Sequence, residues 1–175
     1  MALVLKYGSL RLRPWRQEDA GALVAAHRDP DLRKWLNGIV DSHDEALRWI
    51  EEGEEGWADG SFFRFAVLDG EPGRDGALLG HAVLKCEGDD PGTGEVGYWT
   101  APAARGRGVA SGAVDAVTEW AFAALDVERL ELLHAAPNSA SCRVAEKSGF
   151  ALHSELPPLP PAYPHPGHLH LRLAP

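Results

Sequence analysis

The sequence predicts a single α/β domain over residues 1–175, with a mixed, mostly antiparallel sheet of about seven strands. Two observations lead to this prediction. Short segments with apolar residues at alternate positions are interleaved with longer segments that repeat at helical spacing. One strand–helix–strand unit over residues 95–135 also requires a right-handed parallel crossover. With 175 residues, 45% of them hydrophobic and 25% charged, the chain has the size and composition of one globular domain.

The first third of the chain predicts one strand followed by helices. Leucines alternate with arginines over Ser9–Trp15, which is typical of a half-buried strand. Apolar residues recur at helical spacing over Glu18–His27, and Pro30 separates this helix from a short second one over Asp31–Leu36. Ser42 is expected to cap a longer helix, because the glutamate three residues later completes a capping box.

The rest of the chain alternates strands with helices. Phe62–Leu68 and Leu78–Cys86 are expected to form an antiparallel hairpin through the polar turn Asp69–Gly76, and a loop over Glu87–Gly94 follows. Gly149 is expected to end the last helix in the left-handed conformation. Further strands are expected over Glu95–Thr100, Arg129–Ala135, Phe150–Leu156 and His168–Leu173, and helices over Gly106–Leu125 and Asn138–Lys147.

Charge and composition narrow the choice of partners. The chain has 26 acidic residues against 17 Lys and Arg, a net charge of −9, which argues against a nucleic-acid surface. No apolar run approaches about 18 residues, so no membrane span is expected, and residues 1–8 lack signal-peptide features. Cys86 and Cys142 have no metal-ligand spacing, so reduced thiols in a cytoplasmic protein are expected. The acidic stretch over residues 41–59 suits either a cationic substrate or a solvated helix face.

The most informative segment is residues 105–110, Arg-Gly-Arg-Gly-Val-Ala, between a predicted strand and a predicted helix. Gly106 and Gly108 let the backbone approach an anion, and the N–H groups of a helix start point toward it, so the segment predicts a phosphate cradle. A dinucleotide motif would place its first glycine at the strand end, but Ala101–Arg105 intervenes here. The absence of Gly-Lys-Ser/Thr excludes a P-loop.

Three motifs in order resemble the GCN5-related N-acetyltransferase (GNAT) superfamily, and the similarity extends over most of the chain. Residues 105–110, Arg-x-x-Gly-x-Ala, are similar to its coenzyme signature, Arg/Gln-x-x-Gly-x-Gly/Ala. Residues 95–99, Glu-Val-Gly-Tyr-Trp, and residues 138–150, Asn-Ser-Ala-Ser-Cys-Arg-Val-Ala-Glu-Lys-Ser-Gly-Phe, resemble the RimJ/RimL-like branch, which acetylates ribosomal-protein N-termini. The resemblance implies helices on both faces of the sheet and a central parallel pair of strands that splay apart.

The resemblance also implies acetyl-CoA as the acetyl donor and assigns residues to it. Backbone groups near Trp99 and Thr100 would pair with the pantetheine arm as if it were an added strand. Backbone N–H groups from Arg105 to Ala110 would bind the pyrophosphate, helped by the helix dipole. Asn138 would either bind the pantetheine or cap its own helix. The full coenzyme-binding set comprises Trp99, Thr100, Arg105, Gly106, Arg107, Gly108, Val109, Ala110, Asn138, Ser141 and Arg143.

Two residues are candidates for the proton transfers of acetylation. Glu95, at the cleft end of its strand, is the candidate base for the amine, and an exposed strand-end carboxylate is the alternative. For Ser141 the resemblance implies a proton donor to the coenzyme sulfur, and helix capping is the alternative. Alternation along the strand predicts that Tyr98 packs on the face opposite Glu95 rather than acting as an acid. No feature singles out Cys142 as a nucleophile.

The histidines near the C-terminus raise the question of a metal ion. His165, His168 and His170 lie close together in the sequence, but no carboxylate or cysteine is expected to complete a ligand set. The sequence therefore predicts no metal site. His134 is expected to be a sheet histidine, and assistance as a base is the alternative.

The expected acceptor is an amine, and three functions stay open at this point. They are acetylation of the N-terminal α-amine of a protein or peptide, acetylation of a small amine such as an aminoglycoside or polyamine, and coenzyme binding without catalysis. An α-amine, with a pKa of about 7.7–8.0, needs a weaker base than a lysine at about 10.4. Two segments differ from the sequence pattern of the RimJ/RimL-like branch: the proline-rich loop Pro157–Pro166 and the strand His168–Leu173. Both are expected to border the acceptor pocket. The sequence leaves open whether the chain forms a homodimer.

Overall fold

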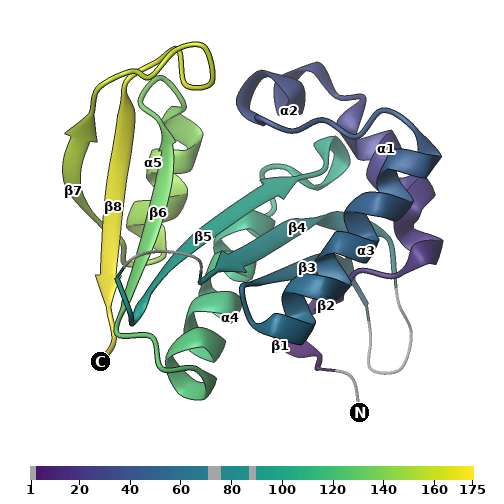
Figure 1. The fold of residues 1–175 in the computed structure, drawn as a ribbon, viewed down its shortest axis with the longest axis horizontal. Coiled ribbons are helices and arrows are strands. Elements are labelled where there is room, and N and C mark those ends of the chain that lie inside the picture. Colours follow the sequence, from purple (N-terminus) through teal and green to yellow (C-terminus); the bar gives the residue numbers. More distant parts are fainter. Residues whose placement is uncertain (1–2, 71–75, 87–89) are drawn as a thin grey trace.

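The fold is given by a computed structural model that describes residues 3–70, 76–86 and 90–175. Eight strands form one sheet in the order β1-β2-β3-β4-β5-β6-β8-β7 (Figure 1). The strands are β1 (Leu5–Tyr7), β2 (Leu10–Pro14), β3 (Phe62–Asp69), β4 (Leu78–Lys85), β5 (Thr93–Thr100), β6 (Arg129–Ala135), β7 (Ala151–Leu156) and β8 (Gly167–Leu173). The helices are α1 (Ala20–His27), α2 (Pro30–Trp35), α3 (His43–Asp59), α4 (Val109–Ala124) and α5 (Ser139–Lys147), with short 3₁₀ segments at Gln17–Asp19 and Pro102–Ala104. The predicted α/β class with a mixed sheet is confirmed.

The parallel pair at the centre of the sheet is β5 and β6, and α4 forms the predicted crossover between them. Their pairing starts at Thr93↔Arg129 and ends at Glu95↔Glu131, although both strands continue beyond these residues. The sheet therefore opens between β5 and the half made of β6, β8 and β7, which Figure 1 shows as a V between the two halves. The predicted splayed pair is confirmed.

Helices cover both faces of the sheet, each over its own buried cluster. On one face, α1–α3 pack over a cluster that includes Leu23, Ile50 and Trp99. On the other face, α4 and α5 pack over a larger cluster that includes Val96 and Phe150. Since side chains alternate along a strand, β5 sends Val96 to the α4 face and Trp99 to the α1–α3 face. This alternation decides which face each β5 side chain of the site can reach.

The strand prediction missed β1, so the sheet has eight strands where about seven were expected. β1 is three residues long and pairs with β2 from Leu5↔Leu12 to Tyr7↔Leu10. The Tyr7 hydroxyl donates to the carboxylate of Asp115 on α4 at 3.0 Å. A contact so distant in sequence cannot be detected in a local pattern. Within the predicted turn and loop after β3 and β4, residues 71–75 and 87–89 lie outside the described residues.

The predicted cap of α3 is confirmed with one change. Ser42 Oγ accepts a hydrogen bond from the Glu45 backbone N–H at 3.2 Å. The Glu45 carboxylate accepts from the backbone N–H of Asp41 at 2.7 Å rather than from that of Ser42, so the box closes one residue earlier than its usual form. Gly149 follows α5 with a φ of 75°, as predicted.

Candidate active site

A cleft of about 1440 Å³ opens where β5 and β6 diverge. It is bordered by both of these strands, by the N-terminal turns of α4 and α5, by α2, and by the loop that precedes β8. The predicted site residues on its lining are Glu95, Trp99, Thr100, Arg105, Gly106, Gly108, Val109, Ala110, Asn138, Ser141 and Arg143. The fold therefore brings all three motif segments to one cavity.

The turn before α4 has the geometry of the predicted phosphate cradle. Gly106 and Gly108 have φ values of 73° and 76°, in the left-handed region that favours glycine. They also delay the start of α4 to Val109, three residues later than predicted. Among the described residues, no backbone N–H from Gly106 to Ser111 donates to a protein acceptor. These N–H groups lie at the positive end of the α4 dipole, where an anion is favoured.

The arginines of the cradle already have acidic partners. The Arg105 guanidinium pairs with the carboxylate of Asp29 and lies 3.5 Å from that of Asp31. Arg107 lies 3.3 Å from the carboxylate of Asp69, and its side chain is not part of the cleft lining. Of the two arginines, Arg105 therefore lines the cleft, whereas Arg107 does not.

The free edge of β5 fits the predicted pairing with an added strand. Along its other edge, β5 pairs with β4 from Lys85↔Glu95 to Gly80↔Thr100. On the β6 side, pairing ends at Glu95, so the following backbone groups face the cleft. The Trp99 side chain is buried against Trp15 and His27 on the α1–α3 face, so only its backbone is available for this pairing. The cradle and the free strand edge both fit a coenzyme A molecule.

Ser141 and Tyr98 meet in the cleft from α5 and β5. The Tyr98 hydroxyl donates to Ser141 Oγ at 2.9 Å. Because Ser141 Oγ accepts this bond, its own proton remains available to another acceptor. Burial raises the pKa of Tyr98, so its hydroxyl stays protonated at neutral pH. Tyr98 packs on the face opposite Glu95, as predicted, but its hydroxyl also belongs to the site, which the sequence prediction missed.

Capping of α5 falls to Asn138 rather than to Ser141. The Asn138 side-chain carbonyl accepts from the Ser141 backbone N–H at 3.3 Å. Asn138 therefore caps the helix with its side-chain oxygen. Ser141 takes part in this cap only through its backbone, so its hydroxyl is left for other chemistry. The Asn138 amide nitrogen has no protein partner among the described residues, so it is available to a ligand in the cleft.

Glu95 lies at the vertex of the V, at the last position where β5 pairs with β6. Its carboxylate forms an ion pair with Lys85 Nζ at 2.7 Å across the β4–β5 ladder. The Glu95 side chain is 40% exposed, so solvent can reach the carboxylate. The residue can therefore accept a proton directly or through water.

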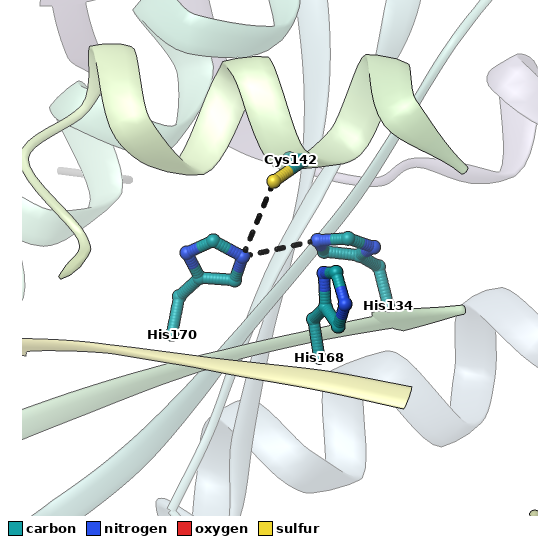
Figure 2. Close-up of side chains that lie close together, drawn as sticks. All are labelled: His134, Cys142, His168 and His170. Carbon is teal, nitrogen blue, oxygen red and sulfur yellow. Dashed lines mark hydrogen bonds between the residues drawn. The ribbon is translucent and has the colours of Figure 1, made fainter. Parts of the chain in front are cut away.

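The prediction that no cysteine accompanies the C-terminal histidines is wrong. Cys142 of α5 lies beside His134, His168 and His170, and one ligand atom from each residue lies within 4.8 Å of the others (Figure 2). His165 is not a member of this group. The sequence reasoning failed because it considered neighbours in the sequence, whereas the cysteine reaches the histidines from a separate helix.

Comparison with known families decides the class of the protein. The family model for the acetyltransferase (GNAT) domain matches residues 9–151. The chain belongs to the GNAT acetyltransferase family. Members of this family take the acetyl group from acetyl-CoA, which agrees with the donor expected from the motifs.

Relatives of this GNAT enzyme show how far the similarity extends. It is 27% identical over 145 residues to the uncharacterized protein YkkB of Bacillus subtilis (strain 168), with 81% of each chain covered. The structure of RimL, a ribosomal L7/L12 alpha-N-protein acetyltransferase in complex with coenzyme A, matches with a TM-score of 0.85 at 17% identity over 98% of both chains. The ribosomal-protein-S5-alanine acetyltransferase of Vibrio fischeri matches with a TM-score of 0.84 at 17% identity, covering 98% of this chain and 97% of that one. The two structures show a shared GNAT fold.

Within residues 3–70, 76–86 and 90–175, every helix is too short or too polar to cross a bilayer.

Gly108→Ala should weaken coenzyme binding by the GNAT enzyme about 5- to 30-fold. Holding a residue with a Cβ at a φ of 76° costs about 1–2 kcal/mol, so the cradle would lose its shape although the added methyl meets no atom within 4 Å. Calorimetric titration with coenzyme A would measure the change. Gly21→Ala is the matched control, because Gly21 lies exposed in α1 and its added methyl also has room. Equal affinities of both variants would contradict the cradle.

Buried histidines beneath the cleft make the stability of the enzyme depend on pH. Burial lowers the pKa of His81 to about 3. His81 Nδ1 lies 3.1 Å from Trp15 Nε1, which can only donate, and 3.1 Å from the carbonyl oxygen of Phe65, which can only accept. His27 is buried in the same region, and burial lowers its pKa as well.

The free energy of unfolding should therefore fall as the pH falls below about 6.5. Between that pH and about 3, the unfolded chain binds a proton at His81 that the folded chain excludes, which costs up to about 1.4 kcal/mol per pH unit. Urea denaturation of the wild type and of His81→Gln at pH 4–7 would measure the two slopes. The variant should show a smaller pH dependence, and identical slopes would rule out His81 as the source.

Proposed function

We propose that this GNAT enzyme transfers the acetyl group of acetyl-CoA directly to the N-terminal α-amine of a protein or peptide. The observation that carries the proposal is the placement of two proton-transfer groups on opposite faces of the opened sheet. Tyr98 and Ser141 lie on the α4 face, whereas Glu95 shares the α1–α3 face with Trp99. A reaction centre between them would have a proton acceptor on one side and a proton donor on the other.

These two groups supply what aminolysis of a thioester requires. Acetyl-CoA supplies a thioester whose carbonyl carbon bonds to the amine nitrogen while its C–S bond breaks. Glu95, directly or through water, takes the proton that the amine nitrogen loses. Ser141 gives its hydroxyl proton to the departing sulfur and can recover one from Tyr98 through the 2.9 Å hydrogen bond. Solvent then takes the proton from Glu95 and returns one to Tyr98, so atoms and charges balance without a covalent enzyme intermediate.

The cleft is narrow where α2 faces the proline-rich loop, and a narrow opening supports an acceptor that enters as a chain end. Trp35 of α2 and His165 of the proline-rich loop approach each other across the mouth, with ring centroids 6.4 Å apart. Both line the cleft, and the loop contributes further residues. The proline-rich segment therefore borders the cavity, as expected. The acidic face of α3 does not, because Trp49 is the α3 residue on the lining, which favours a solvated role for those acids.

The choice of an α-amine follows from the modest base that the structure offers. Glu95 is part exposed and paired with Lys85. An α-amine with a pKa of about 7.7–8.0 is partly neutral at neutral pH, whereas deprotonating a lysine would cost about 4 kcal/mol. The RimL and ribosomal-protein-S5-alanine acetyltransferases, which share the fold, are named for protein N-terminal acceptors.

A thiol-release assay with acetyl-CoA tests the acceptor class. We expect turnover with peptides that carry a free α-amine and none with the same peptides blocked at that amine. Faster turnover with aminoglycosides or polyamines than with any peptide would favour the small-amine alternative. Measurable coenzyme binding without thiol release for any acceptor would favour a non-catalytic binding module.

Glu95→Gln should lower kcat/KM most strongly at low pH. We expect a loss of about tenfold at pH 7 that shrinks toward pH 9, because at high pH the α-amine loses its proton without a base. The pH profile of kcat/KM for wild type and variant would measure this. A deficit that stays constant from pH 7 to pH 9 would assign Glu95 a structural role through its ion pair with Lys85.

A further inference from the structure

Four side chains with metal-binding atoms converge beside the cleft from three elements (Figure 2). His134 of β6 lies directly opposite His168 of β8, and His170 follows two residues later on the same face. Cys142 of α5 reaches down to them from the helix that covers this face. The mechanism described above uses none of these four residues.

Two of the separations between ligand atoms are close to those of a tetrahedral zinc site. His134 Nε2 and His170 Nε2 lie 3.2 Å apart, and Cys142 Sγ lies 3.8 Å from His170 Nε2. Zinc bonds of about 2.0–2.1 Å to nitrogen and 2.3 Å to sulfur place two nitrogens about 3.3 Å apart and nitrogen and sulfur about 3.6 Å apart around a tetrahedron. All four ligand atoms lie within 4.8 Å of one another, so small side-chain movements that draw them together would complete this geometry.

Hydrogen bonds on the far side of two rings fix their nitrogens for metal binding. Nδ1 of His170 lies 3.2 Å from the carbonyl oxygen of Phe150, and Nδ1 of His134 lies 2.8 Å from that of Ala135. A carbonyl can only accept, so both Nδ1 atoms carry hydrogen, and in the neutral rings both Nε2 atoms carry lone pairs. Two lone pairs that face each other at 3.2 Å repel unless a cation lies beside them.

His168 completes the set with its Nδ1 atom. Its Nδ1 is buried and has no hydrogen-bond partner among the described residues. Its Nε2 lies 4.0 Å from a carboxylate oxygen of Glu155 on β7. A carboxylate hydrogen-bonded to the distal nitrogen of a ligating histidine is a common outer partner of zinc sites, and Glu155 would take this place by moving closer to the ring.

We propose that His134, Cys142, His168 and His170 bind one Zn²⁺ ion. Imidazole and thiolate ligands together favour zinc over magnesium or calcium, which prefer oxygen. Four protein ligands close the coordination shell, so the ion is structural and supplies no open position for catalysis. It ties α5, which carries Ser141, to β6 and β8, and so holds the Ser141 hydroxyl in position from behind the cleft wall.

Metal titration of the full chain, stripped with a chelator and dialysed, tests the proposal. Zn²⁺ should bind with a stoichiometry of one per chain, and Co²⁺ used as a probe should show the thiolate charge-transfer band of a tetrahedral site with a cysteine ligand. Cys142→Ser should abolish that band and weaken Zn²⁺ binding at least tenfold. Cys86→Ser is the matched control, since Cys86 is the other free cysteine and lies outside the cluster, and it should bind like the wild type.

Thermal unfolding gives a second readout for the same ion. Added Zn²⁺ should raise the Tm of the wild type and of Cys86→Ser, and this shift should be lost in Cys142→Ser and in His168→Gln. His168→Gln keeps the test decisive if Cys142→Ser does not fold, because His168 is part exposed and tolerates replacement. Absence of stoichiometric binding, a cobalt spectrum without the thiolate band, or wild-type affinity in the folded variants would overturn the proposal.

Discussion

Ser141→Ala should lower kcat for acetyl transfer about 100-fold or more, with little change in coenzyme affinity. Proton donation by a positioned side chain is worth about 10²–10⁴ in rate, and the variant removes the donor to the departing sulfur. The loss should appear in kcat, because the α4 cradle and the free edge of β5, which we expect to hold most of the coenzyme, are unchanged in this variant. Steady-state kinetics with a peptide acceptor, together with a coenzyme titration, would measure the two effects separately.

Tyr98→Phe distinguishes donation from a purely structural role of the serine. This variant keeps the Ser141 hydroxyl but removes the bond that orients it, so we expect a smaller kcat deficit of about tenfold. Ser154→Ala on β7, away from the cleft lining, is the control for serine loss and should behave like the wild type. Wild-type kcat in Ser141→Ala would contradict the assigned proton donor.

Asp19→Ala should lower the free energy of unfolding by about 3–5 kcal/mol. Asp19 accepts two hydrogen bonds from the Arg13 guanidinium, at 2.7 and 3.0 Å, and a third from the backbone N–H of Arg16. The Arg13 side chain is 4% exposed, so the variant removes two charge-assisted hydrogen bonds from a buried cation. Since a domain of this size is stable by about 5–15 kcal/mol, urea denaturation should show a large shift of the midpoint.

The double variant Arg13→Met/Asp19→Ala is the matched control for this ion pair. Removing both charges avoids separating the two partners of a buried ion pair, so most of the lost stability should return. A double variant as unstable as Asp19→Ala would show that the loss comes from packing or from the bond to Arg16 rather than from the buried charge.

The parts of the fold that repeat locally could be predicted from the sequence. The alternation in β2, the capping box of α3 and the glycine turn before α4 each depend on residues a few positions apart. The β5–α4–β6 crossover followed from element order alone, since two parallel strands need a helix between them. β1 could not be predicted, because three residues carry too little pattern and their support comes from α4.

The same distinction holds for the site. The phosphate cradle could be predicted because it lies within one continuous segment. The contact of Tyr98 with Ser141 could not, because it depends on where β5 and α5 meet across the opened sheet. Likewise, the sulfur of Cys142 joins His134 and His170 only through the packing of α5 on β6 and β8. A histidine pair at alternate positions of a strand was the one local signal, and it does not reveal the fourth ligand.

The most direct test of the proposed function is to locate the acetyl group after a reaction with a peptide that contains both a free α-amine and an internal lysine. Fragmentation mass spectrometry of the product should find one acetyl group on the α-nitrogen, formed in step with thiol release from acetyl-CoA. No acetyl group should be found on the enzyme itself. Acetyl on the lysine, acetyl retained on a protein cysteine, or thiol release without acetylated peptide would contradict direct transfer to an N-terminal amine.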